Sequence, residues 1–252
     1  MIAPCGMSPE SNIPRQLILN FPTQREFTFS NFSVSKGSLT AYASAQKIAG
    51  TESTGVSSLF LHGAKNLGKT HLLIAIGNEL AVHSPEKNTC YVDVGTLLNS
   101  ASDTHIPNAK IALLAEADVV LFDALDGIEN HPILQENLYH VYNSLAEKGG
   151  TTVFSSRSHP RDLRVADYLE SRFLWGMTAD IQPFDPESME QVIIKLGHDA
   201  GLVIPPAGAH YIINRIDRNF SAMKKTVDIL NEYSFRKKCK VTVPLIKEAL
   251  NL

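Results

Sequence analysis

A glycine-rich segment with one lysine and one hydroxyl side chain carries the clearest chemistry in this sequence. Residues 63–70 fit the spacing G-x-x-x-x-G-K-[ST], which is typical of a loop that binds nucleotide phosphates. Its glycines let backbone N–H groups wrap around phosphate oxygens, and the N-terminus of a following helix favours negative charge. The predicted nucleotide ligands of this segment are Gly63, Ala64, Asn66, Leu67, Gly68, Lys69, Thr70 and His71.

A buried acid is the expected second half of such a site. Residues 117–122 form a nearly continuous apolar run, which predicts a strand buried on both faces of a parallel sheet, and Asp123 follows directly. A carboxylate at the end of that strand can hold the water shell of Mg²⁺. We therefore predict Thr70 as a direct Mg²⁺ ligand and Asp123 as a ligand through water. An Asp123 that only caps the next helix remains an alternative.

Strand and helix patterns alternate around these residues, as an α/β protein requires. The strand candidates are 57–62, 89–94, 117–122, 151–155 and 177–181. The helix candidates are 38–49, the segment from the glycine-rich loop to about residue 81, and 132–148. A strand before the loop and a helix after it argue against an accidental glycine-rich turn. The alternation predicts a parallel sheet flanked by helices.

The strand pattern stops at residue 185. Helices are expected at roughly 186–200, 207–215, 220–236 and 242–250, which predicts a small all-helical lid domain. The expected organisation is a flexible tail over residues 1–24, a nucleotide-binding core over 25–183, and the lid over 184–252.

Composition restricts the function classes. A chain of 252 residues with 44% hydrophobic and 19% charged residues can bury a substantial core, and its net charge of −3 argues against direct electrostatic binding to nucleic acid. Cys5, Cys90 and Cys239 have no paired spacing, which favours a reducing cytoplasm. No apolar run is long enough to span a bilayer, so no membrane partner is expected.

Four segments occur in an order that resembles the AAA+ core of the bacterial replication initiator DnaA. They are Phe27–Val34, the glycine-rich loop, Asp123 and Leu169–Gly176. The resemblance implies an AAA+ fold, ADP or ATP as the ligand, and Phe32 and Val34 beside the adenine base. It also implies that Arg172 is an arginine finger, a cation that acts in trans on the γ-phosphate of a neighbouring subunit's nucleotide. Without the surrounding match, Arg172 would be interpreted as a surface charge.

The sequence departs from the AAA+ pattern where hydrolysis would be promoted. Ala124 stands where a second acid usually orients the attacking water, and Asp126 or Glu129 would have to replace it from unexpected spacings. Residues 155–157, where the γ-phosphate is sensed, lack the usual Asn or Asp. We expect weak or no intrinsic ATPase activity.

The lid departs from the family as well. Ser221 stands where family members usually present an arginine to the phosphates, and Lys224 or Lys225 could substitute. Family initiators also continue past the lid into a DNA-binding domain, whereas this sequence stops at residue 252. The basic residues between 236 and 240 are interpreted as a solvated helix face rather than a nucleic-acid patch.

The N-terminal segment contains a second motif. Residues 16–21 resemble the hexapeptide Q-L-x-L-x-[LF] that docks proteins on the DNA polymerase sliding clamp. Its expected contacts are Gln16 to polar backbone groups, and Leu17, Leu19 and Phe21 to an apolar pocket. A staple that fixes the segment to the core is the alternative.

Together these features resemble the regulatory members of the DnaA family. The resemblance implies DnaA and the clamp as partners, with DNA contacted indirectly through the clamp, and a role in negative regulation of replication initiation. An autonomous AAA+ ATPase such as a helicase loader and a clamp-tethered adaptor with a non-catalytic phosphate loop remain alternatives. The sequence leaves open ADP against ATP and a homo-oligomer.

Overall fold

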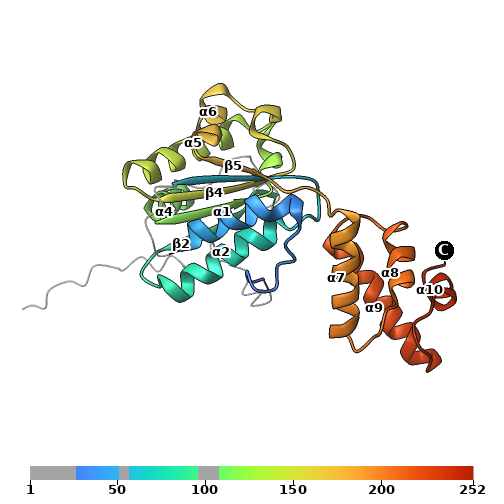
Figure 1. Ribbon diagram of the computed structural model, residues 1–252. Coiled ribbons are helices and arrows are strands. Elements are labelled where there is room, and N and C mark those ends of the chain that lie inside the picture. Colours follow the sequence, from blue (N-terminus) through green and yellow to red (C-terminus); the bar gives the residue numbers. More distant parts are fainter. Residues whose placement is uncertain (1–26, 51–56, 96–107, 252) are drawn as a thin grey trace, which may run out of the picture.

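A five-stranded parallel sheet forms the centre of the larger part of the protein (Figure 1). The computed structural model describes residues 27–50, 57–95 and 108–251. The strands follow the spatial order β2-β3-β4-β1-β5. Their bounds are β1 Ser58–His62, β2 Thr89–Asp93, β3 Val119–Asp123, β4 Thr151–Ser156 and β5 Met177–Asp180. The predicted α/β fold class is confirmed, and each strand falls within two residues of its predicted bounds.

Helices cover both faces of the sheet, which explains why the central strands β1, β3 and β4 are almost completely buried. One face packs against α1 (Leu39–Ala49) and α2 (Lys69–His83). The other packs against α4 (Asn108–Glu116), α5 (Pro132–Glu147) and α6 (Asp167–Trp175) (Figure 1). All five residues of β3 are buried, because this strand has neighbours on both sides and helices on both faces.

Aromatic side chains fix the register of the three central strands. Phe60 of β1 and Phe122 of β3 both pair with Phe154 of β4, which lies between them. The Phe122 and Phe154 rings stack with centroids 5.4 Å apart. Because the strands are parallel and in register, their carboxyl ends meet at one edge of the sheet, where His62, Asp123 and Ser156 end their strands.

Four helices form a separate layer with its own core. They are α7 (Pro186–Asp199), α8 (Pro206–Ile213), α9 (Phe220–Lys237) and α10 (Val243–Leu250), and Figure 1 shows them beside the sheet domain. Met189, Ile212 and Met223 are fully buried among them. The side chain of Asp185 accepts a hydrogen bond from the Ser188 N–H at 2.9 Å and so caps α7. The predicted helical lid is therefore confirmed.

The structure also contains helices that the sequence pattern does not predict. Among the described residues these are α4, α6 and the 3-10 helices η2 (Lys36–Ser38), η3 (Leu125–Ile128) and η4 (Pro160–Asp162). The predicted tail over residues 1–24 lies outside the described residues. Within the described ranges, no helix is long and apolar enough to cross a membrane.

Candidate nucleotide-binding site

A cavity of about 630 Å³ lies at the carboxyl edge of the sheet. Its walls come from residues 65–71 of the glycine-rich loop and α2, from the segment before α1, from the ends of β3 and β4, and from the start of α9 in the lid. This volume falls within the range of small-ligand sites. The cavity therefore joins the core and the lid around the loop that the sequence singled out.

The glycine-rich loop has a backbone that restricts two of its positions to glycine. Gly63 has φ +145° and Gly68 has φ +99°, both conformations that side chains rarely adopt. A Cβ on Gly63 would collide with the Ile181 carbonyl, and one on Gly68 would lie 2.7 Å from the Phe32 ring. The loop is thereby held close to β5 on one side and to an aromatic ring on the other.

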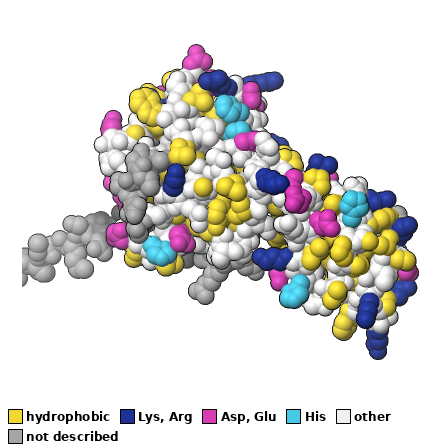
Figure 2. Space-filling model, in the orientation of Figure 1, with side chains coloured by type: hydrophobic (Ala, Val, Ile, Leu, Met, Phe, Trp, Pro, Cys, Tyr) yellow, Lys and Arg dark blue, Asp and Glu magenta, His cyan; other side chains and the backbone are white. Residues whose placement is uncertain are grey.

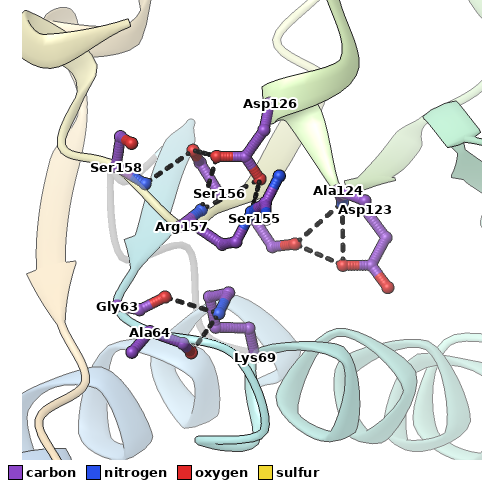
Figure 3. Close-up of polar contacts among 10 residues, drawn as sticks. All are labelled: Gly63, Ala64, Lys69, Asp123, Ala124, Asp126, Ser155, Ser156, Arg157 and Ser158. Carbon is purple, nitrogen blue, oxygen red and sulfur yellow. Dashed lines mark hydrogen bonds and ion pairs between the residues drawn. The ribbon is translucent and has the colours of Figure 1, made fainter.

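Lys69, the first residue of α2, folds over the loop (Figure 3). Its Nζ donates hydrogen bonds to the carbonyl oxygens of Gly63 at 2.6 Å and Ala64 at 2.7 Å. Burial lowers the pKa of Lys69, whereas the nearby Asp126 and Asp123 carboxylates act against that shift. An ammonium group partly removed from water interacts strongly with a phosphate oxygen, because solvent screening is reduced.

Asp123 accepts hydrogen bonds from side chains of three different elements, α2, β2 and β4. Its Oδ2 accepts from the Thr70 hydroxyl at 2.7 Å and from the Tyr91 hydroxyl at 2.9 Å, while Oδ1 accepts from the Ser155 hydroxyl. Asp123 is 6% exposed as a whole residue. Thr70 and Asp123 thus bring two hard oxygen ligands together beside the phosphate loop, a donor set that fits Mg²⁺.

The alternative role of Asp123 as a helix cap does not match the structure. The next element is η3, its N-cap residue is Ala124, and no side chain caps it. The Asp123 carboxylate instead accepts the Ala124 N–H at 3.0 Å, which holds it at the edge of the sheet.

The position expected to orient an attacking water has no acid. Ala124 lines the cavity in a left-handed conformation with φ +56°. Asp126 also lines the cavity, but its carboxylate accepts hydrogen bonds from Ser156 and Arg157. Glu129 is not among the lining residues, and it accepts a hydrogen bond from the Arg164 N–H at 3.3 Å.

Aromatic side chains also line the cavity beside the glycine-rich loop. Phe32 lines the cavity and stacks on Tyr42, with ring centroids 5.7 Å apart. The Phe32 and His71 rings pack in a T-shaped arrangement with centroids 5.1 Å apart. His71 also lines the cavity, and burial lowers its pKa. Val34 is 41% exposed and is not among the lining residues. A contact between Val34 and a base is therefore not supported by this geometry and stays a prediction.

Several lining residues were not found from the sequence. Phe27 and Asn31 come from the segment before α1, Gln182 and Phe184 from the connection after β5, and Phe220 from the lid. Phe27 and Asn31 belong to the segment Phe27–Val34 that resembles the DnaA core, so the sequence contained a signal for these two residues. Gln182, Phe184 and Phe220 had none, because their placement depends on how the lid meets the core.

The lid contributes Ser221 to the cavity, whereas Lys224 and Lys225 are not lining residues. Core and lid are joined by an ion pair of 3.1 Å between the Lys36 Nζ and the Glu187 Oε2. Figure 2 shows lid lysines and arginines spread among acidic and hydrophobic side chains on this face. Lys237, one of the basic residues near the end of α9, pairs with Glu248 at 2.8 Å.

Arg172 lies on α6 and is not among the residues that line the cavity. Its Nε donates to the Asn143 Oδ1 at 3.0 Å, and its guanidinium lies 5.5 Å from the Tyr139 ring and 5.4 Å from the Trp175 ring. Trp175 is 74% exposed. The half-buried Arg172 side chain is thus held by contacts with α5 and α6, outside the cavity that contains the phosphate loop.

Gln16, Leu17, Leu19 and Phe21 lie outside the described residues. Within the described ranges, no group of three or more His, Cys, Asp or Glu side chains could hold a metal ion by itself. A Mg²⁺ ion at Thr70 and Asp123 would therefore need further oxygen ligands from phosphates and water.

Comparisons with known proteins agree with this geometry. Residues 23–180 match the family model of the bacterial DnaA ATPase domain, and residues 186–250 match that of the lid domain of Hda. The chain is 29% identical over 255 residues to the chromosomal replication initiator DnaA of Symbiobacterium thermophilum, covering 98% of this chain and 55% of that protein. With DnaA of Lactiplantibacillus plantarum the identity is 31% over 229 residues, covering 89% and 50%. The chain thus spans about half the length of these relatives.

Solved structures show the same fold. Domain III of DnaA from Thermotoga maritima superposes with a TM-score of 0.79 at 26% identity, covering 90% of this chain and 96% of that one. AMPPCP-bound DnaA from Aquifex aeolicus gives 0.74 at 21% identity, covering 84% and 69%. The branch migration motor RuvB of Thermotoga maritima gives 0.68 at 15%, covering 89% and 71%. The predicted AAA+ fold is therefore confirmed.

Proposed function

We propose, from the premise that the chain belongs to the family of bacterial DnaA ATPase domains, that it is a negative regulator of replication initiation. It promotes hydrolysis of the ATP bound to DnaA by presenting Arg172 to that nucleotide. The observation that carries this proposal is the position of Arg172, which is held at the surface and outside the chain's own cavity. The match of residues 186–250 to the lid domain of Hda supports a regulatory member of the family.

The contacts of Arg172 suit a cation that acts in trans. Asn143 accepts a hydrogen bond from one N–H of the guanidinium, and the guanidinium lies over the Tyr139 and Trp175 rings. A guanidinium has five N–H donors, so these contacts leave donors for a phosphate. A prearranged cation stabilises charge on a transferring phosphoryl group without losing energy to reorganisation.

The chain's own cavity binds ADP or ATP in this proposal. Lys69 and the loop amides contact the phosphates, and Phe32 and His71 border the base side. Mg²⁺, bound by Thr70 and through water by Asp123, neutralises phosphate charge when present. Because Ala124 carries no acid and the Asp126 carboxylate is occupied, intrinsic hydrolysis is weak. The nucleotide then serves mainly to join core and lid.

Docking on the DNA-loaded sliding clamp through residues 16–21 completes the proposal. Gln16, Leu17, Leu19 and Phe21 are the contacts, and DNA is approached only through the clamp. Such tethering raises the local concentration of the regulator where replication proceeds. The setting is the cytoplasm, and self-association is compatible with the proposal.

Two other functions each have one observation in their favour. An autonomous ATPase, such as a helicase loader, is favoured by the joined Thr70 and Asp123 side chains. It requires ATP turnover by the isolated chain that Lys69→Ala abolishes. An adaptor with a non-catalytic phosphate loop is favoured by Ser221 in the lid wall. It requires no thermal stabilisation by excess ADP.

Stimulated hydrolysis by ATP-loaded DnaA, measured with clamp and DNA, tests the proposal. Arg172→Ala should leave clamp binding intact and lower the stimulated rate by about 10³-fold or more. Arg161→Ala is the matched control, because Arg161 is an exposed arginine of the sheet domain that does not line the cavity. Gln16→Ala should lose clamp binding instead. Normal stimulation by the Arg172→Ala variant refutes the mechanism.

A further inference from the structure

A histidine stands at the base of the phosphate loop, outside the residues that line the cavity. His62 ends β1 and directly precedes Gly63, the first residue of the loop. It pairs with Asp180, the last residue of β5, and the His62 Nδ1 lies 3.4 Å from the Asp180 Oδ1. The His62 side chain is only 16% exposed. Protonation of this imidazole therefore takes place largely away from water and beside a carboxylate.

A second imidazole limits the number of protons that this group of side chains holds. His159, the residue before η4, packs against His62 in a T-shaped arrangement with ring centroids 5.0 Å apart. The His159 Nδ1 accepts the Arg161 backbone N–H at 3.2 Å, so this nitrogen carries no proton in the observed arrangement. Two imidazolium ions this close repel each other. The pair therefore takes up one proton in preference to two, and His62, beside Asp180, is the residue that takes it.

Charged and titratable groups face His62 from β5, from η4 and the residue before it, and from α2. Burial is the largest influence and lowers the pKa of His62, and the charges of His159 and Lys69 act in the same direction. Asp180 of β5 and Asp162 of η4 act against this shift. The pKa of His62 thus lies below its ordinary 6.5, and the side chain is mainly neutral at pH 7.

Lys69 connects His62 to the phosphate site. Its Nζ donates a hydrogen bond of 2.6 Å to the carbonyl oxygen of Gly63, the residue next to His62 in the chain (Figure 3). A phosphate group on the loop neutralises the Lys69 ammonium and adds negative charge to the same region. Both changes favour the protonated form of His62, because a nearby cation destabilises imidazolium and a nearby anion stabilises it. The pKa of His62 therefore rises when phosphates bind.

Asp180 connects His62 to the wall of the cavity. The Asp180 Oδ2 accepts a hydrogen bond from the side-chain amide of Gln182 at 3.0 Å, and Gln182 lines the cavity. The Gln182 backbone N–H donates to the Gly37 carbonyl oxygen at 3.0 Å. Protonation of His62 turns its 3.4 Å contact with Asp180 into an ion pair. The ion pair then holds the carboxylate that orients Gln182.

We propose that His62 takes up a proton when a nucleotide binds, so that the cavity binds nucleoside phosphates more tightly as the pH falls below neutral. By linkage, a group whose pKa is higher in the complex than in the free protein binds more protons in the complex, and lower pH then favours the complex. The pH window begins near the ordinary histidine pKa of about 6.5 and extends downward. This inference rests on the proposed nucleotide ligand, and it is independent of the proposed action on DnaA.

Calorimetric titration of the full chain with ADP and Mg²⁺, in two buffers of different ionisation enthalpy, measures the proton uptake. Because ADP and other histidines also titrate, wild type is compared with His62→Gln. Wild type should take up more protons per ADP at pH 6. Between pH 7.5 and pH 5.5 its affinity for ADP should gain about threefold relative to that of His62→Gln.

Two further variants sharpen the comparison. Asp180→Asn removes the carboxylate that favours protonated His62, so its affinity should gain less than that of wild type over the same pH range. His83→Gln is the matched control, because His83 also lies beside a carboxylate, that of Glu79 at 3.3 Å, and is not among the lining residues. His83→Gln should behave as wild type. Circular dichroism at both pH values verifies that each variant is folded.

The contrary results are distinct. Equal proton uptake and equal pH dependence in wild type and His62→Gln would overturn the role of His62, and so would a loss of both effects in His83→Gln. A pH dependence in Asp180→Asn as large as in wild type would overturn the role of the carboxylate. Absence of ADP binding to wild type at either pH would refute the nucleotide ligand and this inference together. Stimulated hydrolysis by DnaA is tested separately with Arg172→Ala.

Discussion

The contact between Gly68 and the Phe32 ring leads to a quantitative prediction about the stability of the protein. Replacing Gly68 by alanine forces a side chain into a backbone with φ +99° and places its Cβ 2.7 Å from one ring carbon of Phe32 and 3.3 Å from another. Two separable penalties result. One is backbone strain at Gly68, and the other is displacement of the Phe32 ring.

The two penalties differ in origin and can be measured apart. Left-handed strain costs a non-glycine residue roughly 1–2 kcal/mol. Overpacking against a ring adds about 1–3 kcal/mol, because Phe32 is stacked on Tyr42 and packs edge-on with His71, and both contacts oppose its displacement. We expect Gly68→Ala to lower the free energy of unfolding by about 2–5 kcal/mol in total.

A matched glycine elsewhere isolates the strain. Gly149 has φ +73°, and a Cβ built there meets no atom within 4 Å. Gly149→Ala should therefore cost only the roughly 1–2 kcal/mol of strain. Gly68→Ala should cost a similar amount in a Phe32→Ala background, where the ring is gone. The coupling between positions 32 and 68 should be about 1–3 kcal/mol.

Urea denaturation of the four variants of the cycle provides the measurement. Far-ultraviolet circular dichroism, which reports on the helices and strands of both core and lid, follows the unfolding. If Gly68→Ala destabilises the core equally with and without the Phe32 ring, the packing of that ring on the loop is refuted.

Two further predictions concern thiols and protons. Cys239, which is exposed, should react with iodoacetamide under native conditions, whereas Cys90 should react only after unfolding, because it is 2% exposed and burial raises its thiol pKa to about 11. Mass mapping of the modified peptides checks this, and rapid native labelling of Cys90 would contradict its burial. Burial lowers the pKa of His71 below its ordinary 6.5, so the unfolded chain binds a proton that the folded chain does not, and stability should fall as pH drops below about 6.5. Urea titrations at several pH values should show that the free energy of unfolding falls less steeply with decreasing pH in His71→Gln, by at most about 1.4 kcal/mol per pH unit. An equal slope in the variant and the wild type would exclude His71 as the cause of this pH dependence.

The sheet and the lid could be predicted because their signals are local. An apolar run such as that of β3 is legible wherever both faces of a strand are buried. The sequence did not predict α6, because only Leu169 and Phe173 are buried among its nine residues. Its apolar face is therefore too narrow to show a helical period. The described part of α4 has only one fully buried leucine, Leu114, which explains the same omission there.

The phosphate loop is what the sequence by itself determined about the site. Backbone conformations at Gly63 and Gly68, and the adjacency of Lys69 and Thr70, are properties of eight consecutive residues. They follow from steric limits on φ and from the start of a helix, which need no distant partner. The position of Asp123 could also be predicted, because it depends only on the apolar run that directly precedes it.

Only the tertiary structure decided which charges face the cavity. Asp126 and Arg157 are 31 residues apart and meet because β3 and β4 pair in one register. Arg172 lies outside the cavity because α6 packs on the far face of the sheet, where Asn143 of α5 accepts its Nε–H. Side-chain pairing across elements depends on strand order and helix packing, and neither is encoded in the spacing of residues along one segment.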